Sequence, residues 1–241
     1  MEAMSDIDVV VLCGGKGERL RSVIGEAPKV MTEINGQPFL NYILEYLKSQ
    51  KVGRVILCTG YKAEVIEKYY RKHSFGLVID FAREHKPLGT AGAIKHAEPV
   101  INGNPVIVLN GDCYCPVDFK KFIQFHKRNK ALATLVVTRM AQGSDYGEVV
   151  LDNNKRIIGF REKRAGAKHV FVNTGIYCFD RTVLAKIPPS KKASLEYDCF
   201  PQWIGQRFWG FPVESGFLDM GTPERLKAAS DLLSHICGGV L

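Results

Sequence analysis

Short apolar runs alternate with amphipathic stretches along the first half of the chain, and this alternation restricts the fold more than any other feature. The first run, at 8–13, is continuously hydrophobic and rich in β-branched residues, which is typical of a parallel strand buried on both faces of a sheet. The stretches between the runs repeat apolar residues at helical spacing, as Leu40, Ile43, Leu44 and Leu47 do. We expect strands at 8–13, 54–59, 77–81 and 105–110, and helices at 39–50, 62–72, 90–97 and 117–129.

Strand and helix in strict turn predict an α/β fold, with a Rossmann-like, mostly parallel sheet and helices on both faces. After residue 130 the pattern changes to a smaller, antiparallel half. Strands are expected there at 133–138, 147–151, 156–161 and 170–179. A last helix should follow Thr222, with Pro223 at its first position. Neither a linker nor a repeat is visible, so residues 1–241 are expected to form a single domain.

Charge and composition favour small anionic partners. The net charge of +8 suits an anion, but the interleaved basic and aromatic motifs of nucleic-acid readers are missing, so no nucleic acid is expected. We find no apolar run of membrane length and no leader-like start, and therefore expect no membrane partner. The seven cysteines are scattered, and Cys113 and Cys115 lack zinc-knuckle spacing. Reduced thiols and a cytoplasmic location are the expectation.

A glycine-rich loop follows the first expected strand. Gly14, Gly15 and Gly17 allow a sharp turn and let backbone N–H groups approach a ligand closely. The loop lacks the Gly-Lys-Ser/Thr end of a Walker A motif, and Leu20 stands where a dinucleotide fingerprint needs glycine. Four cations lie close to the turn, which favours a highly charged phosphate chain as the ligand; a solvated basic loop is the alternative. These cations are Lys16, Arg19, Arg21 and Lys29.

Two more polar segments follow expected strands, at 88–93 and at Asn110-Gly-Asp112. Ligands of open parallel sheets bind beyond the carboxyl ends of the strands, so these segments and the glycine loop should share one site. A carboxylate such as Asp112 is repelled by phosphate unless a cation lies between them, and Mg²⁺ is the usual bridge. The alternative is that Asp112 only caps the next turn.

Five motifs, taken together, resemble the signature of the sugar nucleotidyltransferases, although each alone is weakly specific. The resemblance extends from residue 8 to about residue 230, nearly the whole chain. Within that family, stretches 22–29 and 35–47 resemble guanylyltransferases that act on a heptose 1-phosphate. The motifs are Gly14-Gly-Lys-Gly-Glu-Arg-Leu20 with Pro28-Lys29, Leu88-Gly-Thr-Ala-Gly92, Gly111-Asp112, Asn173-Thr-Gly175 and Asp219-Met-Gly-Thr-Pro223.

The resemblance implies a role for each matched position. Arg19 and Lys29 would act on the phosphates, and Asp112 and Asp219 would hold Mg²⁺. The chain departs from the family pattern at Cys199, close to Glu196, and at Cys113-Tyr-Cys115. The second departure puts in doubt the local shape of the metal loop, but not the carboxylate of Asp112. The nucleotide-binding residues would be Leu12, Gly14, Gly15, Gly17, Gly89, Thr90 and Gly111, and the sugar-binding residues Glu162, Asn173, Gly175 and Glu196.

The implied reaction joins a nucleoside triphosphate to a sugar 1-phosphate and releases pyrophosphate. The attacking phosphate oxygen is already ionised at neutral pH, because a phosphate monoester has a second pKa of ~6. No general base is then required, which agrees with the lack of a Ser/His/Asp or Cys/His constellation. Catalysis of this kind rests on positioning and charge.

Three hypotheses about function remain open. The closer resemblance favours GTP and D-glycero-α-D-manno-heptose 1-phosphate as substrates. A related transferase could use mannose 1-phosphate or another base. A catalytically silent regulatory subunit is the third, and intact Lys29, Asp112 and Asp219 argue against it. The expected partners are the two small substrates, and a homodimer is possible.

Overall fold

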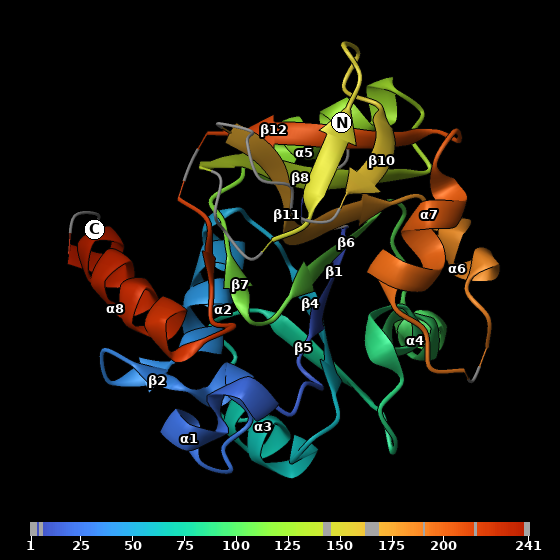
Figure 1. Ribbon diagram of the computed structural model, residues 1–241. Helices are drawn as coiled ribbons and strands as arrows, with labels where there is room; N and C mark the ends of the chain where they lie inside the picture. The colour runs from blue at the N-terminus through green and yellow to red at the C-terminus, as the bar shows by residue number, and fades with distance from the viewer. Residues whose placement is uncertain are drawn as a thin grey trace.

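The computed structural model describes residue 4 and residues 7–141, 146–161, 169–189, 191–214 and 216–238. Its centre is a nine-stranded sheet with helices on both faces (Figure 1). The strand order along the main path is β10-β9-β11-β6-β1-β4-β5, with β8 beside β11 and β12 beside β8. The expected α/β fold with a mostly parallel, Rossmann-like sheet is therefore confirmed.

The parallel part of the sheet is made by the first half of the chain. In it, β1 pairs in parallel with both β4 and β6, and β4 pairs in parallel with β5. A helix follows each of these strands, as the alternation predicts. The strands are β1 (Asp8–Leu12), β4 (Arg54–Thr59), β5 (Val78–Arg83) and β6 (Val106–Asn110), and the helices are α2 (Phe39–Ser49), α3 (Ala63–Tyr70), α4 (Gly89–Ala97) and α5 (Phe119–Arg128).

Both faces of β1, β4 and β6 are buried, which explains their largely apolar sequences, whereas β5 at the edge of the sheet is partly exposed and carries Asp80. Val9 and Val11 of β1 belong to a core shared with α2, α3 and α5, whereas Val10 belongs to a second core shared with α4. Figure 1 shows α2 and α4 on opposite sides of these strands. Side chains alternate in direction along a strand, so a run with no polar position is the pattern that two covered faces require.

The antiparallel half continues the same sheet. Its longest strand, β11 (His169–Phe179), pairs antiparallel with β6 and with β8 (Ala133–Ala141), and the register with β8 shifts between Asn173 and Tyr177. The strands β9 (Glu148–Leu151) and β10 (Ile157–Arg161) pair antiparallel beside it. Because β11 joins both halves, residues at its bend lie beside the carboxyl end of β6.

Several short elements and one edge strand were not expected from the sequence. The missed strand β12 (Phe208–Val213) contains Pro212 and pairs in parallel with β8 at the edge of the sheet, where proline is tolerated. The two-residue strands are too short to show the alternation of apolar and polar residues that marks a strand in the sequence. The other unexpected elements are β2 (Glu33–Ile34), β3 (Gln37–Pro38), β7 (Cys113–Tyr114), β13 (Leu218–Asp219), α1 (Arg21–Ile24), α6 (Val183–Lys186) and α7 (Phe200–Trp203). The last helix, α8 (Pro223–Gly238), was expected.

The last helix starts at Pro223, as expected, and the Thr222 hydroxyl accepts a hydrogen bond from the Arg225 backbone amide at 3.4 Å. Cys13, Cys58, Cys113, Cys115, Cys178 and Cys199 are free thiols. None of the helices in the described ranges is both long and apolar enough to cross a membrane.

An aromatic cluster on the α7 side of the sheet provides a test of the packing. Phe200 is fully buried, with ring centroids 5.4 Å from Phe208, 5.5 Å from Tyr177 and 5.6 Å from Trp203. We expect Phe200→Ala to lower the free energy of unfolding by about 3–5 kcal/mol, since it removes a buried ring and leaves a cavity.

Urea denaturation followed by circular dichroism measures this change. The matched control is Tyr197→Ala, which removes a ring that is 86% exposed, and its effect should stay below about 0.5 kcal/mol. Equal effects of the two variants would show that the cluster does not support the fold.

Candidate active site

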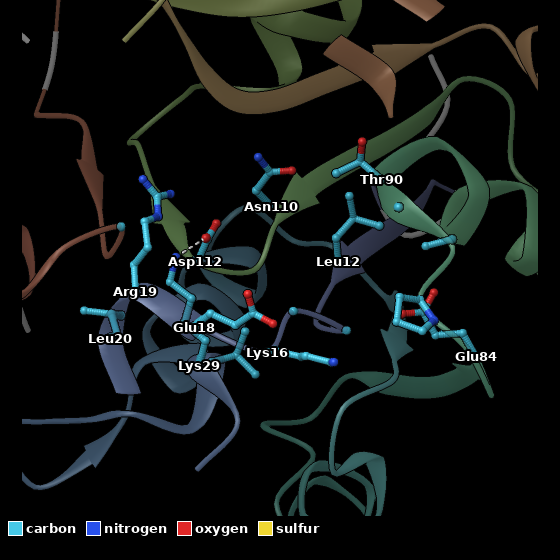
Figure 2. Close-up of a pocket in the computed structure, with 18 of the residues that line it drawn as sticks. Leu12, Lys16, Glu18, Arg19, Leu20, Lys29, Glu84, Thr90, Asn110 and Asp112 are labelled. Atoms are coloured by element: carbon cyan, nitrogen blue, oxygen red, sulfur yellow. Dashed lines mark hydrogen bonds and ion pairs between the residues drawn. The ribbon is translucent and has the colours of Figure 1, made fainter. Parts of the chain in front are cut away.

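The carboxyl ends of the parallel strands open into one cavity of about 600 Å³. Figure 2 shows Arg19, Lys29 and Asp112 on one side of it and Thr90 and Glu84 on the other. The glycine loop, the 87–93 segment and the turn after β6 all contribute to the lining, as the rule for open parallel sheets requires. The lining residues include Leu12, Gly14, Gly15, Lys16, Gly17, Glu18, Arg19, Lys29, Glu84, Gly89, Thr90, Asn110, Asp112, Lys192 and Gly221.

The glycine loop needs its glycines for different reasons. Gly17 has a φ of +62°, in the left-handed region that disfavours side chains. A Cβ on Gly14 would come within 2.5 Å of Glu84 Oε1, so that loop and the end of β5 are in close contact. The Gly14 carbonyl accepts a hydrogen bond from the Tyr61 amide at 3.3 Å, which ties the loop to the end of β4. Residues 14–17 all line the cavity, and the backbone of Gly15 has no neighbouring atom within 4 Å of the position of a Cβ.

Lys29 points into the site rather than into solvent. Its Nζ lies 2.5 Å from Asp112 Oδ2, and its side chain is only 12% exposed against 33% for Asp112. Pro28 ends the loop in an extended conformation, and Lys29–Met31 forms a short 3₁₀ turn that aims the lysine at the end of β6. An ammonium in this position is available to an anion that approaches Asp112 through the cavity.

The second acidic residue, Asp219, reaches the same region through a small antiparallel pair. Strand β13 places Asp219 opposite Cys113 of β7, and the Met220 amide donates to the Asp112 carbonyl at 3.0 Å. Asp219 is buried, and its carboxylate accepts from the Gly221 amide at 2.6 Å and from Arg225 Nη1 at 3.1 and 3.2 Å. Both predicted metal carboxylates are thus paired with a protein cation.

These donors suit a hard cation that takes most of its ligands from water and phosphate. Mg²⁺ typically uses one or two carboxylates together with phosphate oxygens, and two carboxylates are what β7 and β13 bring together. Among the described residues, no group of three or more His, Cys, Asp or Glu side chains could hold a metal ion. The arrangement fits Mg²⁺ and does not resemble a closed zinc site.

The loop between β5 and α4 is held close to a distant segment of the chain. Gly89 has a φ of +74°, and a Cβ there would lie 2.4 Å from the Ala193 carbonyl oxygen. That carbonyl accepts from the amides of Ala91 and Gly92 at 3.0 and 3.2 Å. A side chain at position 89 would therefore push the loop away from residues 191–196, which join the cavity to the sugar-binding cluster predicted from the sequence.

Glu84 closes the same end of the cavity. Its Oε2 accepts from the Leu88 amide at 3.1 Å, and its Oε1 lies against Gly14 and Gly60. Burial raises the pKa of this carboxyl above its usual value, although the Leu88 hydrogen bond and the nearby His96 act in the opposite direction. The site therefore contains a partly buried hydrogen-bond acceptor, the Glu84 carboxylate, at the end of the cavity where Gly14 and Gly60 lie.

A hydrogen-bonded cluster, made of Thr90, Asn173, Tyr177, Ser194 and Glu196, adjoins the cavity at Thr90. Glu196 Oε2 accepts from the hydroxyls of Ser194 and Thr90 at 2.8 and 3.2 Å, and its Oε1 accepts from the Tyr177 hydroxyl at 3.2 Å. Asn173 Nδ2 donates to the Tyr177 hydroxyl at 3.0 Å, while Asn173 Oδ1 accepts from the Gly175 amide. Burial, with Glu196 beside it, raises the pKa of Tyr177 well above its usual value, so Tyr177 remains a neutral donor.

Comparison with known proteins identifies this architecture. The family model described as Nucleotidyl transferase matches residues 8–235. The chain belongs to the nucleotidyl transferase family. The resemblance inferred from the motifs is confirmed, and the chain is an enzyme of the sugar-1-phosphate nucleotidyltransferase type.

Two relatives illustrate the similarity. A D-glycero-α-D-manno-heptose 1-phosphate guanylyltransferase of Aneurinibacillus thermoaerophilus is 36% identical over 95% of this chain and 99% of its own length. A mannose-1-phosphate guanylyltransferase of Mycobacterium tuberculosis is 34% identical over 97% of this chain and 67% of its own length. The crystal structure of HddC from Yersinia pseudotuberculosis matches with a TM-score of 0.85 and 35% identity, over 94% of this chain and 99% of that one. The same protein has also been solved in complex with GMP-PN.

The family's predicted site residues fall into three groups in this structure. The first group lines the cavity: Leu12, Gly14, Gly15, Gly17, Arg19, Lys29, Gly89, Thr90 and Asp112. The second group lies around it: Gly111 beneath Leu12, Asp219 beside Arg225, and Asn173, Gly175 and Glu196 in the hydrogen-bonded cluster. Glu162 lies outside the described residues.

Four residues that the structure places at the site were not predicted from the sequence. Glu84 was missed because the expected strand ended at 81, whereas β5 continues to Arg83 and makes Glu84 a strand-end residue. Tyr177 lies four residues after Asn173, and the irregular part of β11 between them brings the two side chains within hydrogen-bond distance. Arg225 follows Asp219 by six positions and meets it only because α8 starts between them. Lys192 carries no motif of its own.

The burial of Glu84 predicts a pH-dependent difference in stability between the wild type and Glu84→Gln. Because the pKa of Glu84 is higher in the folded than in the unfolded state, its contribution to stability is fully present below pH 4.5 and is lost as pH rises through the folded pKa. Glutamine keeps the acceptor for the Leu88 amide without the charge. The melting temperature of Glu84→Gln relative to wild type should therefore rise between pH 4 and pH 7.

Differential scanning fluorimetry across that range measures the effect. Glu64→Gln, which changes an exposed carboxylate paired with Arg83, is the matched control and should give a nearly constant difference. A Glu84→Gln difference that falls as pH rises would contradict a desolvated Glu84.

Proposed function

We propose that this enzyme joins GTP and D-glycero-α-D-manno-heptose 1-phosphate to give the GDP-heptose and pyrophosphate. The observation that carries the guanine assignment is the partly buried Glu84 carboxylate at the glycine-lined end of the cavity. The two heptose-specific matches along nearly the whole chain, from Aneurinibacillus and from Campylobacter jejuni, support the sugar.

Hydrogen-bond chemistry explains why a carboxylate favours guanine. An ionised carboxylate only accepts hydrogen bonds. The Watson–Crick edge of guanine offers two neighbouring donors, the N1–H and the exocyclic N2–H₂. Adenine and cytosine each place a ring-nitrogen acceptor beside their donor, and uracil and thymine flank a single N–H with carbonyl oxygens. Glu84 can therefore accept hydrogen bonds from both donors of guanine. With the other bases, one carboxylate oxygen would face another acceptor, which is unfavourable.

The chain's own residues supply charge and position at the phosphate end. Arg19 and Lys29 approach the phosphates from the glycine loop, and the bare N–H groups of Gly14 to Gly17 add fixed dipoles. Asp112 and Asp219 would hold Mg²⁺, which neutralises phosphate charge when bound. The sugar phosphate brings its own ionised nucleophile, so these groups align two polyanions and do not remove a proton.

The hydrogen-bonded cluster would receive the sugar. Glu196 and Asn173 are predicted to contact sugar hydroxyls, and Tyr177 holds both through its own hydroxyl. Mannose 1-phosphate is the second candidate substrate, because the Mycobacterium relative named for it is nearly as similar as the heptose relatives. Free thiols in the described part of the chain favour a cytoplasmic location. A single domain over 1–241 and a homodimer stay predictions.

A substrate panel tests the proposed reaction. Pyrophosphate release should be fastest with GTP and D-glycero-α-D-manno-heptose 1-phosphate, and each substrate alone should give none. A continuous coupled assay with four nucleotides and both sugar phosphates measures this. Equal rates with all four nucleotides would refute the role of Glu84, whereas preference for mannose 1-phosphate would replace only the sugar.

The position of Lys29 predicts a large catalytic effect. Lys29→Ala should lower turnover about a hundredfold, or ~3 kcal/mol, because one cation is removed where charge develops on the transferred group. Lys29→Arg should restore only part of the rate, since a planar fork does not replace a point charge.

Steady-state kinetics with a thermal melt of each variant gives the comparison. Lys121→Ala is the matched control, because Lys121 is 74% exposed on α5 and should change turnover by less than about twofold. Near-normal turnover of folded Lys29→Ala would show that the glycine loop is only a basic surface.

A further inference from the structure

The two predicted metal carboxylates are held by protein cations in different ways. Lys29 and Asp112 form a tight pair, with Nζ and Oδ2 2.5 Å apart. Arg225 instead uses the single atom Nη1 for both oxygens of Asp219, at 3.1 and 3.2 Å. In a bidentate pair, two different nitrogen atoms of the guanidinium donate parallel hydrogen bonds of about 2.7–2.9 Å to the two carboxylate oxygens. The Asp219 pair is thus the looser of the two.

Burial limits what can replace Arg225. Asp219 is 8% exposed, and its Oδ1 already accepts from the Gly221 amide. A buried carboxylate that loses its cation is strongly disfavoured, so only another cation can take the place of the guanidinium. The neighbouring Asp112 makes that exchange more favourable for a divalent ion, since Asp112 lies next to Cys113, the residue opposite Asp219.

Arg225 has a second favourable environment close at hand. Its guanidinium carbon lies 4.2 Å from the centroid of the Tyr146 ring, which is within cation–π distance. The Tyr146 ring makes an edge-to-face contact with Phe217, with ring centroids 5.4 Å apart. The Arg225 side chain can release Asp219 and stay on this ring.

Arg225 also lies beside the cavity. A Cβ built on Gly221, a cavity-lining residue, would be 3.2 Å from Arg225 Nη1. A phosphate chain in the cavity would therefore bring negative charge near a guanidinium that has lost its carboxylate. The attraction between the phosphates and the Arg225 guanidinium offsets the loss of the Arg225–Asp219 ion pair only when nucleotide and cation are both present.

We propose that Arg225 is an exchangeable counter-ion of Asp219, displaced by a divalent cation, which makes cation binding depend on nucleotide phosphates. The inference rests on the proposed function, in which Asp219 is a cation ligand. Arg225 is then a positioning residue. It suppresses cation binding to the free enzyme and favours it in the nucleotide complex.

Electron paramagnetic resonance with Mn²⁺ alone tests the proposal without any catalysis. The Mn²⁺ dissociation constants of the wild type and of the arginine and Asp219 variants are compared, with and without GTP. Arg225→Gln should bind Mn²⁺ about tenfold more tightly than wild type in the absence of nucleotide, and GTP should tighten its binding less. Arg225→Lys keeps the charge and should stay close to wild type.

Two controls separate the possible failures. Arg71→Gln removes a guanidinium that lies over the Phe81 ring, and it should leave Mn²⁺ binding unchanged. Asp219→Asn should weaken Mn²⁺ binding, so more of the signal of free Mn²⁺ should remain. Unchanged Mn²⁺ affinity in folded Arg225→Gln, with Asp219→Asn weakened, would overturn the counter-ion role. Unchanged Mn²⁺ affinity in Asp219→Asn would instead overturn the assignment of Asp219 as a metal ligand in the proposed function.

Discussion

The register of β1 between its two parallel neighbours sets the position of every group at the site. Leu12 pairs with Cys58 of β4 on one side and with Asn110 of β6 on the other, so the three strands end at one level. The Gly111 amide donates to the Leu12 carbonyl at 3.0 Å, and a Cβ on Gly111 would lie 2.6 Å from that oxygen. The glycine loop and the turn that carries Asp112 are consequently held against each other by backbone contacts.

This constraint decides how strongly charges act at the site. Two unit charges 4 Å apart interact by roughly 1 kcal/mol in water and by about 4 kcal/mol at an effective dielectric constant of 20. Lys29 is 12% exposed, so its attraction for an anion lies toward the stronger end of that range. A surface lysine on a mobile side chain would contribute far less. The backbone register therefore matters for function because it brings cations into a partly dry cavity.

The parallel part of the fold was predicted well from the sequence, because there the hydrophobic pattern along the chain directly reflects which side chains are buried. Continuous apolar runs such as 54–59 marked strands covered on both faces, and the motifs marked their carboxyl ends. The elements that it missed depend on distant partners. Strand β12 exists through its pairing with β8, and β13 through its pairing with β7. No local pattern announces such pairings, so the small sheet beneath Asp219 was not foreseen.

The same distinction applies to the site. Motifs identified residues that lie on one turn, such as Gly17 and Gly89, whose positive φ angles favour glycine locally. Residues that act through contacts across the fold were missed. Glu84 depended on the true end of β5, Tyr177 on the bend in β11, and Arg225 on the angle at which α8 leaves Asp219. Sequence thus reports the residues that shape the loops and omits several that hold them in place.

The thiols near the cavity show why the chemistry must be electrostatic. Burial raises the pKa of Cys13 well above its usual value, and nearby Cys58 and Asp112 raise it further. Burial also raises the pKa of Cys113, which donates to Asp112 Oδ1 at 3.3 Å. The thiolate is the reactive form of cysteine, so both groups are inert at neutral pH. Inert thiols at these positions agree with the proposed reaction, in which the substrate brings its own ionised phosphate and the fold supplies fixed charges.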